Sequence, residues 1–419
     1  MKSIGKILLT LLFFYLLIYI FPFPLNYIPF GVGQFIVEQI TQFWQWTTTI
    51  FYESLFGISY ELNFSERGSG DTLYNYLLIP VQIFVALAIM IIWFVFDWQS
   101  NNKELMMSWF ILLLRYYLAF TMFSYGFSKL FYIQFPELNL MNLTRTFGDS
   151  SPMALLWRFM GYSETYSIFT GAAEILGGGL LLFRRTKILG SLLTFAIMVN
   201  VFMLNMSFDV PVKLYSFHLC IITLIILFPD FSNLFRLFIL NKPTVPLPIN
   251  EYFGKKLYNW ISYGLKVLLL SYVLYGTVSN KLDSQKRYGK RASKNSLYGI
   301  YNISHFIKNG DTLPPLFNDS IRWKQLIIDK NNSLLVMMDD SRIPMVHIID
   351  STNKILKLRP YLEKYNDYDL SYDIRDSIFN LTLINNSDSI HISTKKMERE
   401  DFFLIKRGFH WINEYPMQR

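Results

Sequence analysis

Charged and titratable side chains inside apolar segments are the residues of this chain that could do chemistry. Glu174, Lys129 and His218 each lie in, or at the end of, a run that is otherwise apolar. Such groups are costly inside a membrane and usually face the interior of a helix bundle, which makes them candidates for a functional site. A carboxylate can carry protons there, and a histidine titrates near neutral pH. The sequence therefore predicts Glu174 and His218 as catalytic residues.

Further polar residues follow the same apolar runs. Asn205 and Asp209 precede a turn, Lys213 follows it, and His218 lies one helical turn further on. Glu174 lies about seven residues, roughly 10 Å, from the corresponding end of its own helix. In a single four-helix bundle these groups would converge, and together they could bind a polar headgroup, shuttle protons or protonate a quinone carbonyl. The ligand-binding candidates are Lys129, Asn205, Asp209, Lys213 and Arg115.

A purely structural interpretation of the same residues stays open. Glu174 and Lys129 could form an ion pair between two helices, and Asn205 could hydrogen-bond across helices. Asp209 and Lys213 could be ordinary loop charges, and Arg115, near the opposite end of its helix, is expected to pair or to extend toward the membrane surface. The run Gly177–Gly179 is expected to permit close helix packing.

Cofactor classes can be weighed by counting ligands. A bis-histidine haem needs two buried histidines, and His218 is the only one in an apolar run. The remaining histidines are scattered through the polar C-terminal region, and Cys220 is the only cysteine, which excludes an intrachain disulfide and a CxxC pair. We expect neither haem nor a metal site. The cofactor stays undetermined, with a quinone as the candidate.

The elements that would position these residues are membrane-spanning helices. Only 17% of the 419 residues are charged, whereas about a quarter is usual for soluble domains, and the deficit lies before Val278. A spanning helix needs roughly 20 apolar residues. Residues 27–60 are aromatic but interrupted by polar residues and predict an interfacial helix. The chain contains seven expected spans: Ile7–Phe21, Tyr76–Phe96, Met107–Phe131, Tyr166–Phe183, Ile188–Met206, Leu214–Phe228 and Tyr258–Val278.

Basic residues predict the orientation of these spans. The first span follows two lysines and lacks a small-residue cleavage site, so we expect a retained anchor. Lysines and arginines cluster near residues 2–6, at 103, at 184–187 and at 236–256, all on one side, which indicates the cytoplasm. The region after Asn280 is then exported across a bacterial inner membrane. The basic stretch 281–294 favours the opposite side, but long exported domains largely escape this rule. Because the net charge of +8 resides largely in loops, we expect no nucleic-acid partner.

The C-terminal region alternates short apolar runs with turn residues. This spacing predicts a small antiparallel barrel or sandwich, with turns at 330–333 and 385–388. The closing aromatic segment, residues 407–416, could plug the barrel, line a ligand site or rest on the bilayer. The expected strands are Gln325–Ile328, Leu334–Met338, Val346–Ile349, Ile355–Leu358, Ile378–Ile384, Ile390–Ser393 and Phe402–Ile405.

Four motifs, taken in order, resemble the DoxX-like family of four-helix membrane proteins. They are Arg115-Tyr-Tyr-Leu-Ala-Phe with Gly126-Phe-Ser-Lys129-Leu, then Gly171-Ala-Ala-Glu174-Ile-Leu-Gly-Gly-Gly, then Asn205-Met-Ser-Phe-Asp209-Val-Pro-Val-Lys213, and finally Ser216-Phe-His218-Leu. The resemblance covers about residues 107–235. It implies a four-helix membrane fold, and because the family includes subunits of quinone-linked thiosulfate oxidation, it implies a link to quinones.

These observations predict four regions and leave two functions open. Residues 1–106 hold the anchor, the interfacial segment and the second span; 107–235 form the DoxX-like core; 236–279 form a cytoplasmic loop and the seventh span; and 296–419 form the β-rich domain. The first hypothesis is a membrane component of a quinone-linked redox process. The alternative is a non-enzymatic assembly or cargo factor whose exported β-domain holds a protein partner. The lipid bilayer is a partner in both.

Overall fold

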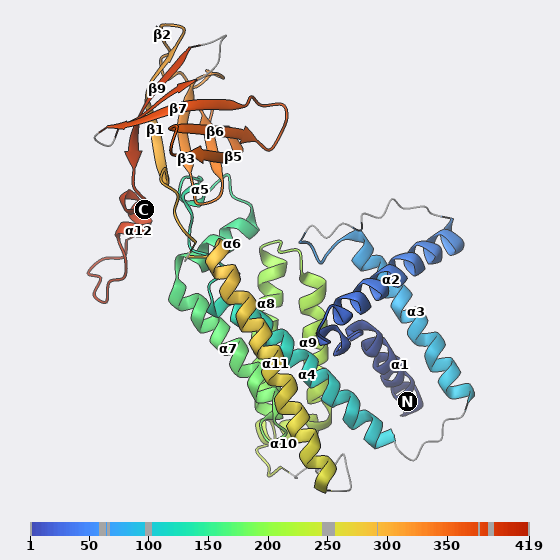
Figure 1. Ribbon diagram of the computed structural model, residues 1–419. Coiled ribbons are helices and arrows are strands. Elements are labelled where there is room, and N and C mark those ends of the chain that lie inside the picture. The colour runs from blue at the N-terminus through green and yellow to red at the C-terminus, as the bar shows by residue number, and fades with distance from the viewer. Residues whose placement is uncertain are drawn as a thin grey trace. The chain divides into compact units, whose positions relative to one another are not determined.

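The protein divides into two compact units, one helical and one built on a β-barrel (Figure 1). The computed structural model describes residues 2–57, 64, 68–96, 103–244, 256–290, 292–375, 378–383 and 389–417. The helical unit comprises residues 1–135 and 152–284, and the barrel unit comprises 136–151 and 285–419. The stretch 136–151 therefore belongs with the barrel, although the sequence places it inside the expected core 107–235.

The helical unit contains long helices joined by short connections. Its elements are α1 (Lys2–Ile20), η1 (Leu25–Tyr27), α2 (Val32–Phe56), α3 (Leu73–Val95), α4 (Lys103–Leu130), α6 (Pro152–Tyr162), α7 (Glu164–Leu182), α8 (Lys187–Ser207), α9 (Lys213–Leu227), η2 (Phe228–Asp230), α10 (Phe231–Phe238) and α11 (Lys256–Tyr288).

Among the described residues, six segments are long and apolar enough to cross a membrane. This confirms a membrane protein with several spans. The expected seventh span lies within α11, and α11 is not one of these six segments. This helix carries Lys266 in its first half and ends in basic residues. Helix α2, the expected interfacial helix, is not one of them either. The six segments are Ile7–Tyr27, Leu73–Val95, Leu105–Leu130, Glu164–Leu182, Lys187–Ser207 and Lys213–Phe238.

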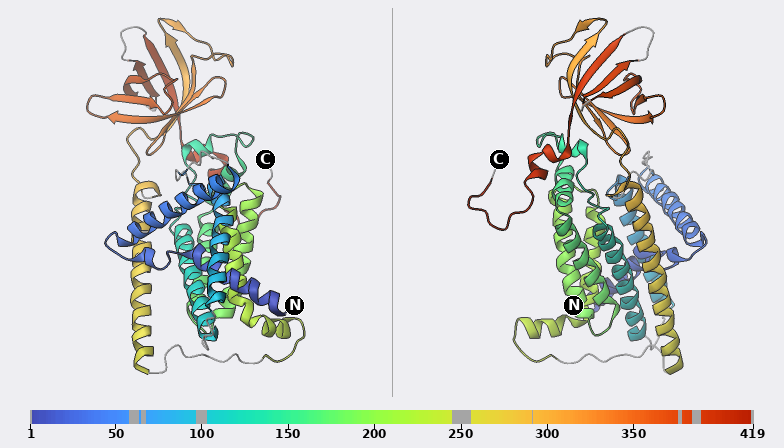
Figure 2. Two further views of the ribbon diagram at one scale, coloured as in Figure 1. Left: turned by 90° about the vertical axis from the view of Figure 1, so that its right-hand side faces the viewer. Right: turned by 60° about the vertical axis from the view of Figure 1, so that its left-hand side comes forward.

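Helices α4, α7, α8 and α9 pack side by side as an antiparallel bundle, which Figure 2 shows from the side. Helix α1 runs parallel to α4, with the ring of Phe13 beside Phe110 and that of Phe23 beside Phe120. Buried apolar side chains from α1, α3, α4, α7, α8 and α9 form one continuous core. The end of the bundle at which α1 and α4 end is the end at which α9 begins, and it carries the site described below.

The contact between α4 and α7 is close because glycines face each other. A Cβ atom built on Gly171 would lie 2.6 Å from the carbonyl oxygen of Gly126, and one on Gly178 would lie 2.9 Å from that of Ala119. Gly177 faces α8, where an added Cβ would meet Thr194 Oγ1 at 2.7 Å. The predicted packing role is thus confirmed for Gly177 and Gly178. It is wrong for Gly179, beside which there is open space.

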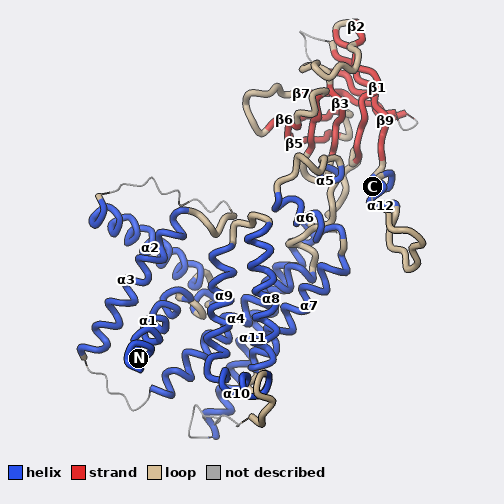
Figure 3. Tube along the Cα trace, turned by 180° about the vertical axis from the view of Figure 1, so that it is seen from behind, coloured by secondary structure: helices blue, strands red, loops and turns tan. Residues whose placement is uncertain are grey.

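The second unit contains an antiparallel barrel in which each strand neighbours the next along the chain (Figure 3). Strands β1 and β3 to β9 follow in order and close through the pairing of β1 with β9, while β2 extends only the end of β1. Within the described residues the elements are α5 (Leu140–Leu143), β1 (Gly299–Lys308), β2 (Asp311–Thr312), β3 (Trp323–Ile328), β4 (Ser333–Met337), β5 (Arg342–Asp350), β6 (Ile355–Pro360), β7 (Tyr368–Arg375), β8 (Ile378–Leu383), β9 (Ile390–Met397), η3 (Arg399–Asp401) and α12 (Phe403–Lys406).

The expected small β-domain is therefore a closed eight-stranded barrel, and the sandwich alternative is excluded. Closure removes the exposed strand edges that an open sheet would present. Large side chains fill the interior, with Trp323, Phe306 and Phe379 fully buried. A barrel of eight strands is just wide enough to be filled by its own side chains.

Two details of the β-domain differ from the sequence-based expectation. Residues 402–405 were expected as a strand, but they belong to the short helix α12 and its N-cap. A short apolar run has no periodicity that distinguishes a helix from a strand. Strands β1 and β7 were not expected, because the expected strands were short and mostly continuous apolar runs, which polar residues interrupt along both. The expected turn at 385–388 lies outside the described residues.

The segment 136–151, between α4 and α6, is fixed to the outside of the barrel. The backbone N–H of Leu140 donates to Asp329 Oδ2 at 3.0 Å, and Arg342 donates to the carbonyl oxygens of Met141 at 2.9 Å and Thr144 at 3.1 Å. Leu140 is also buried in an apolar cluster with residues of β1, β3 and β4. The connection after α4 is thus a structural part of the β-domain.

Two alanine substitutions in α7 test the glycine contact. Gly171→Ala forces a Cβ against α4, and we expect it to lower the free energy of unfolding by about 1–3 kcal/mol through overpacking. Gly179→Ala, in the same helix with open space around it, should be neutral or stabilising because alanine favours helix. Denaturant unfolding in detergent measures both, and equal effects of the two substitutions would contradict the packing argument.

Candidate functional site

The two oppositely charged candidates of the bundle meet directly. Lys129, on the last turn of α4, forms an ion pair and a hydrogen bond with Glu174 Oε1 in the middle of α7. Both side chains are buried, with exposures of 6% and 2%. The second carboxylate oxygen of Glu174 is buried and has no hydrogen-bond partner among the described residues. An unpartnered buried oxygen next to a buried ammonium group can accept a proton or a ligand's donor group.

The close helix contact explains why this pair can form. Gly126 and Gly171 bring the two backbones together, and an added Cβ on Gly171 would lie 2.9 Å from Lys129 Cβ. Glu174 lies three residues further along α7, on the same face of the helix. The lysine therefore reaches the carboxylate from the adjacent helix, without a bridging element.

His218 is bound by a helix that lies outside the expected four-helix core. Its Nε2 lies 2.6 Å from the hydroxyl of Tyr15 on α1, and its Nδ1 lies 2.8 Å from the carbonyl oxygen of Leu214. A carbonyl can only accept, so Nδ1 carries a proton, and in a neutral imidazole Nε2 accepts from the tyrosine hydroxyl. The ring of Tyr19 stacks on the imidazole at 4.1 Å. His218 is thus a buried histidine with a hydrogen-bond partner at each ring nitrogen.

Asn205, Asp209 and Lys213 hold the turn between α8 and α9 together. Asn205 donates from Nδ2 to Ser216 Oγ at 3.0 Å, and Lys213 Nζ lies 2.8 Å from an oxygen of the exposed Asp209. Asp71, from the connection before α3, accepts from the backbone N–H groups of Lys213 and Leu214 at 2.8 and 3.0 Å. Negative charge stabilises a helix N-terminus, so Asp71 fixes the start of α9. The sequence analysis missed Asp71.

Arg115 does not join these residues. Its guanidinium donates from Nε and Nη2 to the carbonyl oxygen of Leu181, at 3.0 and 2.6 Å, close to the end of α7. Lys129 lies 14 residues further along α4, which is about 21 Å of helix. Arg115 therefore belongs to the opposite end of the bundle, where it binds the last turn of α7.

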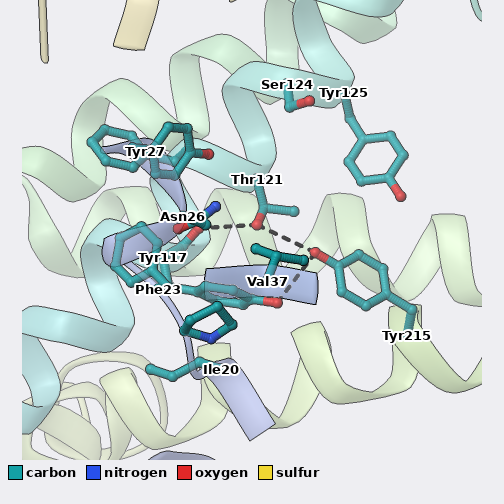
Figure 4. Close-up of a pocket in the computed structure, with 12 residues that line it drawn as sticks. Ile20, Phe23, Asn26, Tyr27, Val37, Tyr117, Thr121, Ser124, Tyr125 and Tyr215 are labelled. Atoms are coloured by element: carbon teal, nitrogen blue, oxygen red, sulfur yellow. Dashed lines mark hydrogen bonds between the residues drawn. The ribbon is translucent and has the colours of Figure 1, made fainter. Parts of the chain in front are cut away.

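A cavity of about 350 Å³ lies at the end of the bundle that carries Lys129 (Figure 4). Its walls come from the end of α1, the connection through η1, helix α2, one face of α4 and the start of α9. A volume in this range suits a small-molecule ligand. The lining residues are Ile20, Pro22, Phe23, Asn26, Tyr27, Val37, Tyr117, Phe120, Thr121, Ser124, Tyr125 and Tyr215.

Hydroxyl groups supply much of the polar lining of this cavity. Tyr117 donates to the hydroxyl of Tyr215 at 3.3 Å, and Thr121 lies 3.4 Å from the same hydroxyl, as the dashed lines in Figure 4 show. The hydroxyls of Tyr27 and Tyr125 have no hydrogen-bond partner among the described residues. These two groups can therefore donate to acceptor atoms of a ligand without breaking an existing bond.

The cavity and the ion pair are neighbours. Tyr125 lines the cavity, and Lys129 Nζ lies 6.0 Å from the centre of its ring, one helical turn further along α4. Tyr117, Thr121 and Tyr125 recur at intervals of four residues, which places them on one face of the helix. This spacing was the signal in the sequence that could have identified the cavity wall. The contributions of α1 and α2 carry no comparable local signal.

Among the histidines outside the bundle, His347 has a structural role. His347 lies 2.8 Å from Ser333 Oγ and 3.3 Å from Asn295 Nδ2, so it joins the chain entering the barrel to strands β4 and β5. Burial lowers the pKa of His347 below its ordinary value. Within the described parts of the chain, no group of three or more His, Cys, Asp or Glu residues is arranged to hold a metal ion.

Comparison with known proteins gives one informative match. No model of a known protein family matches the chain, and no solved structure matches it. The uncharacterized protein YwoB of Bacillus subtilis (strain 168) is 38% identical over 125 residues, which are 79% of that protein and 29% of this chain. The chain belongs to the YwoB family. Because YwoB is uncharacterized, the function is argued from the geometry of the site.

Substitutions at Lys129 and Glu174 test whether the stability of the bundle depends on the pairing of the two charges. Glu174→Gln leaves Lys129 buried without its partner, and we expect a loss of about 3–5 kcal/mol in the free energy of unfolding. The double variant Lys129→Met, Glu174→Gln removes both charges and should recover most of that loss. Asp209→Asn, at an exposed ion pair, should cost less than about 1 kcal/mol. Denaturant unfolding in detergent compares the four proteins, and a double variant no more stable than Glu174→Gln would contradict a paired site.

Proposed function

We propose that the helical unit binds a quinone-class molecule in the tyrosine-lined cavity and acts as a membrane component of a quinone-linked redox process. The observation that carries this proposal is the pair of unpartnered hydroxyls, on Tyr27 and Tyr125, in a cavity lined about equally by polar and apolar surface, beside a buried ion pair. A quinone ring needs hydrogen-bond donors for its two carbonyl oxygens and apolar surroundings for its ring and side chain. The cavity provides both.

The buried pair gives the site a means of exchanging protons. A quinone that takes up two electrons also takes up two protons, one on each carbonyl oxygen. Lys129 and Glu174 together share protons next to Tyr125, and the free oxygen of Glu174 can hold one of them. In this proposal Glu174 carries protons, Tyr125 orients a carbonyl, and the electrons come from a donor protein of the same process. His218, bound to Tyr15, is a positioning residue for α1.

The resemblance to DoxX-like proteins fits the same proposal. Helices α4, α7, α8 and α9 carry the four motifs in order, and they form one antiparallel bundle. We propose that this bundle is a DoxX-like core. Its extensions supply two walls of the cavity, from α1 with η1 and from α2.

A second role is favoured by the filled interior of the barrel. Because its own side chains occupy the interior, the barrel has its outer surface and its loops available for recognition. We propose as the alternative that the barrel holds a protein partner and that the whole chain is an assembly or cargo factor. In that case, binding of a quinone-class molecule would be absent.

Chain connectivity supports the expected orientation of the barrel. The segment 136–151 follows α4 and is built into the barrel, so the barrel lies on the side of the membrane where α4 ends. Three spans, α7, α8 and α9, then return the chain to the other side. Helix α11 must cross as a seventh span for the chain to reach the barrel again. We propose that the N-terminus is cytoplasmic in a bacterial inner membrane and that the barrel is periplasmic.

Quinone binding can be measured with decylubiquinone in nanodiscs. Removing one hydroxyl donor by Tyr125→Phe keeps the ring, and we expect a 2- to 10-fold weaker affinity, as for the loss of one hydrogen bond. Tyr272→Phe, an exposed tyrosine on α11, should leave the affinity unchanged. Glu174→Gln should retain binding and slow the reduction of the bound quinone by an added chemical reductant, because the two protons must then reach the carbonyl oxygens without the carboxylate. No binding to the wild type, or equal affinities of both tyrosine variants, would contradict the proposal.

Single-cysteine labelling tests the seven crossings. Cys220→Ser removes the only cysteine, after which Ser341→Cys on the barrel and Thr244→Cys, beyond the end of α10, report the two sides. In intact cells or spheroplasts, we expect a membrane-impermeant maleimide to label position 341 and to leave position 244 unlabelled until the cells are opened. Labelling of both positions or of neither, or the reverse pattern, would show that the orientation is wrong.

A further inference from the structure

The last described segment of the chain presents large apolar side chains to the outside. After β9, η3 and α12, residues 407–417 form a loop that leaves the barrel, drawn in red near the C-terminus in Figure 1. Phe409, Trp411, Ile412 and Tyr415 are between 75% and 88% exposed. The idea that this segment plugs the barrel is therefore wrong, because the barrel is filled by its own strands and the loop lies outside it.

The loop is folded so that its polar groups bind one another. The guanidinium of Arg407 donates to Asn413 Oδ1 at 2.6 Å and to the sulfur of Met417 at 3.2 Å, which closes the loop. Asn413 in turn donates to the carbonyl oxygen of His410 at 3.1 Å. These hydrogen bonds are themselves exposed, and they hold the loop closed while its large apolar side chains stay uncovered. Exposed apolar patches of this kind mark interaction sites.

The segment that precedes the loop, from Arg399 to Phe402, is held close to the chain that leaves the span in α4. Arg399, in η3, pairs with Glu137 at 2.5 Å, and Phe402 packs on the apolar cluster that contains Leu140. Glu137 lies seven residues beyond Leu130, where the span in α4 ends. Seven residues reach at most about 25 Å, and the twelve residues from Arg399 to Trp411 reach about 43 Å. Covalent connections alone therefore keep the loop within reach of the bilayer surface.

We propose that residues 403–417 form an interfacial anchor that inserts into the bilayer surface on the side where α4 ends. Trp and Tyr prefer the headgroup level of a membrane, where an amphipathic ring meets both apolar and polar surroundings. From residue 402 to the end, the sequence has three positive residues, Lys406, Arg407 and Arg419, against one negative residue, Glu414. This excess of positive charge fits a surface of anionic lipids.

The anchor gives the barrel a second attachment to the membrane. The first is covalent, through α11 and the segment 136–151. Insertion of the loop adds a non-covalent attachment at the level of the headgroups. The proposal is independent of quinone binding, because it uses only the barrel unit and the end of α4.

Spin labelling of the full chain in nanodiscs tests the anchor. In a Cys220→Ser background, Ile412→Cys carries a nitroxide in the loop, and Ser341→Cys carries one on an exposed barrel turn. In nanodiscs that contain anionic phosphatidylglycerol, we expect the label at 412 to collide with oxygen several times more readily than with a water-soluble nickel chelate. The label at 341 should show the opposite preference. Replacing the anionic lipid by phosphatidylcholine, or introducing Lys406→Glu, should move the label at 412 toward water.

Two outcomes would overturn the proposal. A label at 412 as accessible to the nickel chelate as the label at 341 would show that the loop stays in water. A label at 412 that is protected equally in detergent and in nanodiscs, without dependence on lipid charge, would show that a protein surface covers the loop instead. Crosslinking between chains would then identify a second copy.

Discussion

The close contact of α4 with α7 is the constraint on which the site depends. Two glycines, Gly126 and Gly171, remove the side chains that would hold these helices apart. Only at this separation does Lys129 reach Glu174 directly, and only then is the carboxylate enclosed. A charged pair buried in an apolar bundle is costly unless its geometry is good, so the glycines and the ion pair depend on each other. The same face of α4 continues into the cavity through Tyr125.

Segments outside the four-helix core complete the site. Helix α1 contributes Tyr15, which donates to His218, and it continues into the connection that forms one cavity wall. Asp71, from the connection before α3, fixes the first turn of α9 and so positions Tyr215. A bundle of four helices alone would leave the cavity open on the side of α1 and would leave His218 without its donor. The extensions therefore have a direct physical role in the site.

The barrel is tied to the membrane region through more than its linker. The segment after α4 supplies an apolar side chain, Leu140, and backbone carbonyl groups that Arg342 binds. Because this segment begins after α4 and ends before α6, the chain passes between the two units three times.

The sequence by itself determined the division into apolar helices and a β-rich end, because long apolar runs and short alternating ones leave a local pattern. It also indicated Glu174, Lys129 and His218, since charge is conspicuous in an apolar run. Only the tertiary structure decided which partners these residues have. The pairing of Lys129 with Glu174, the separation of Arg115 from both, and the closure of the barrel by β1 and β9 join residues far apart in the chain. Such contacts depend on how whole elements pack, and no local pattern records them.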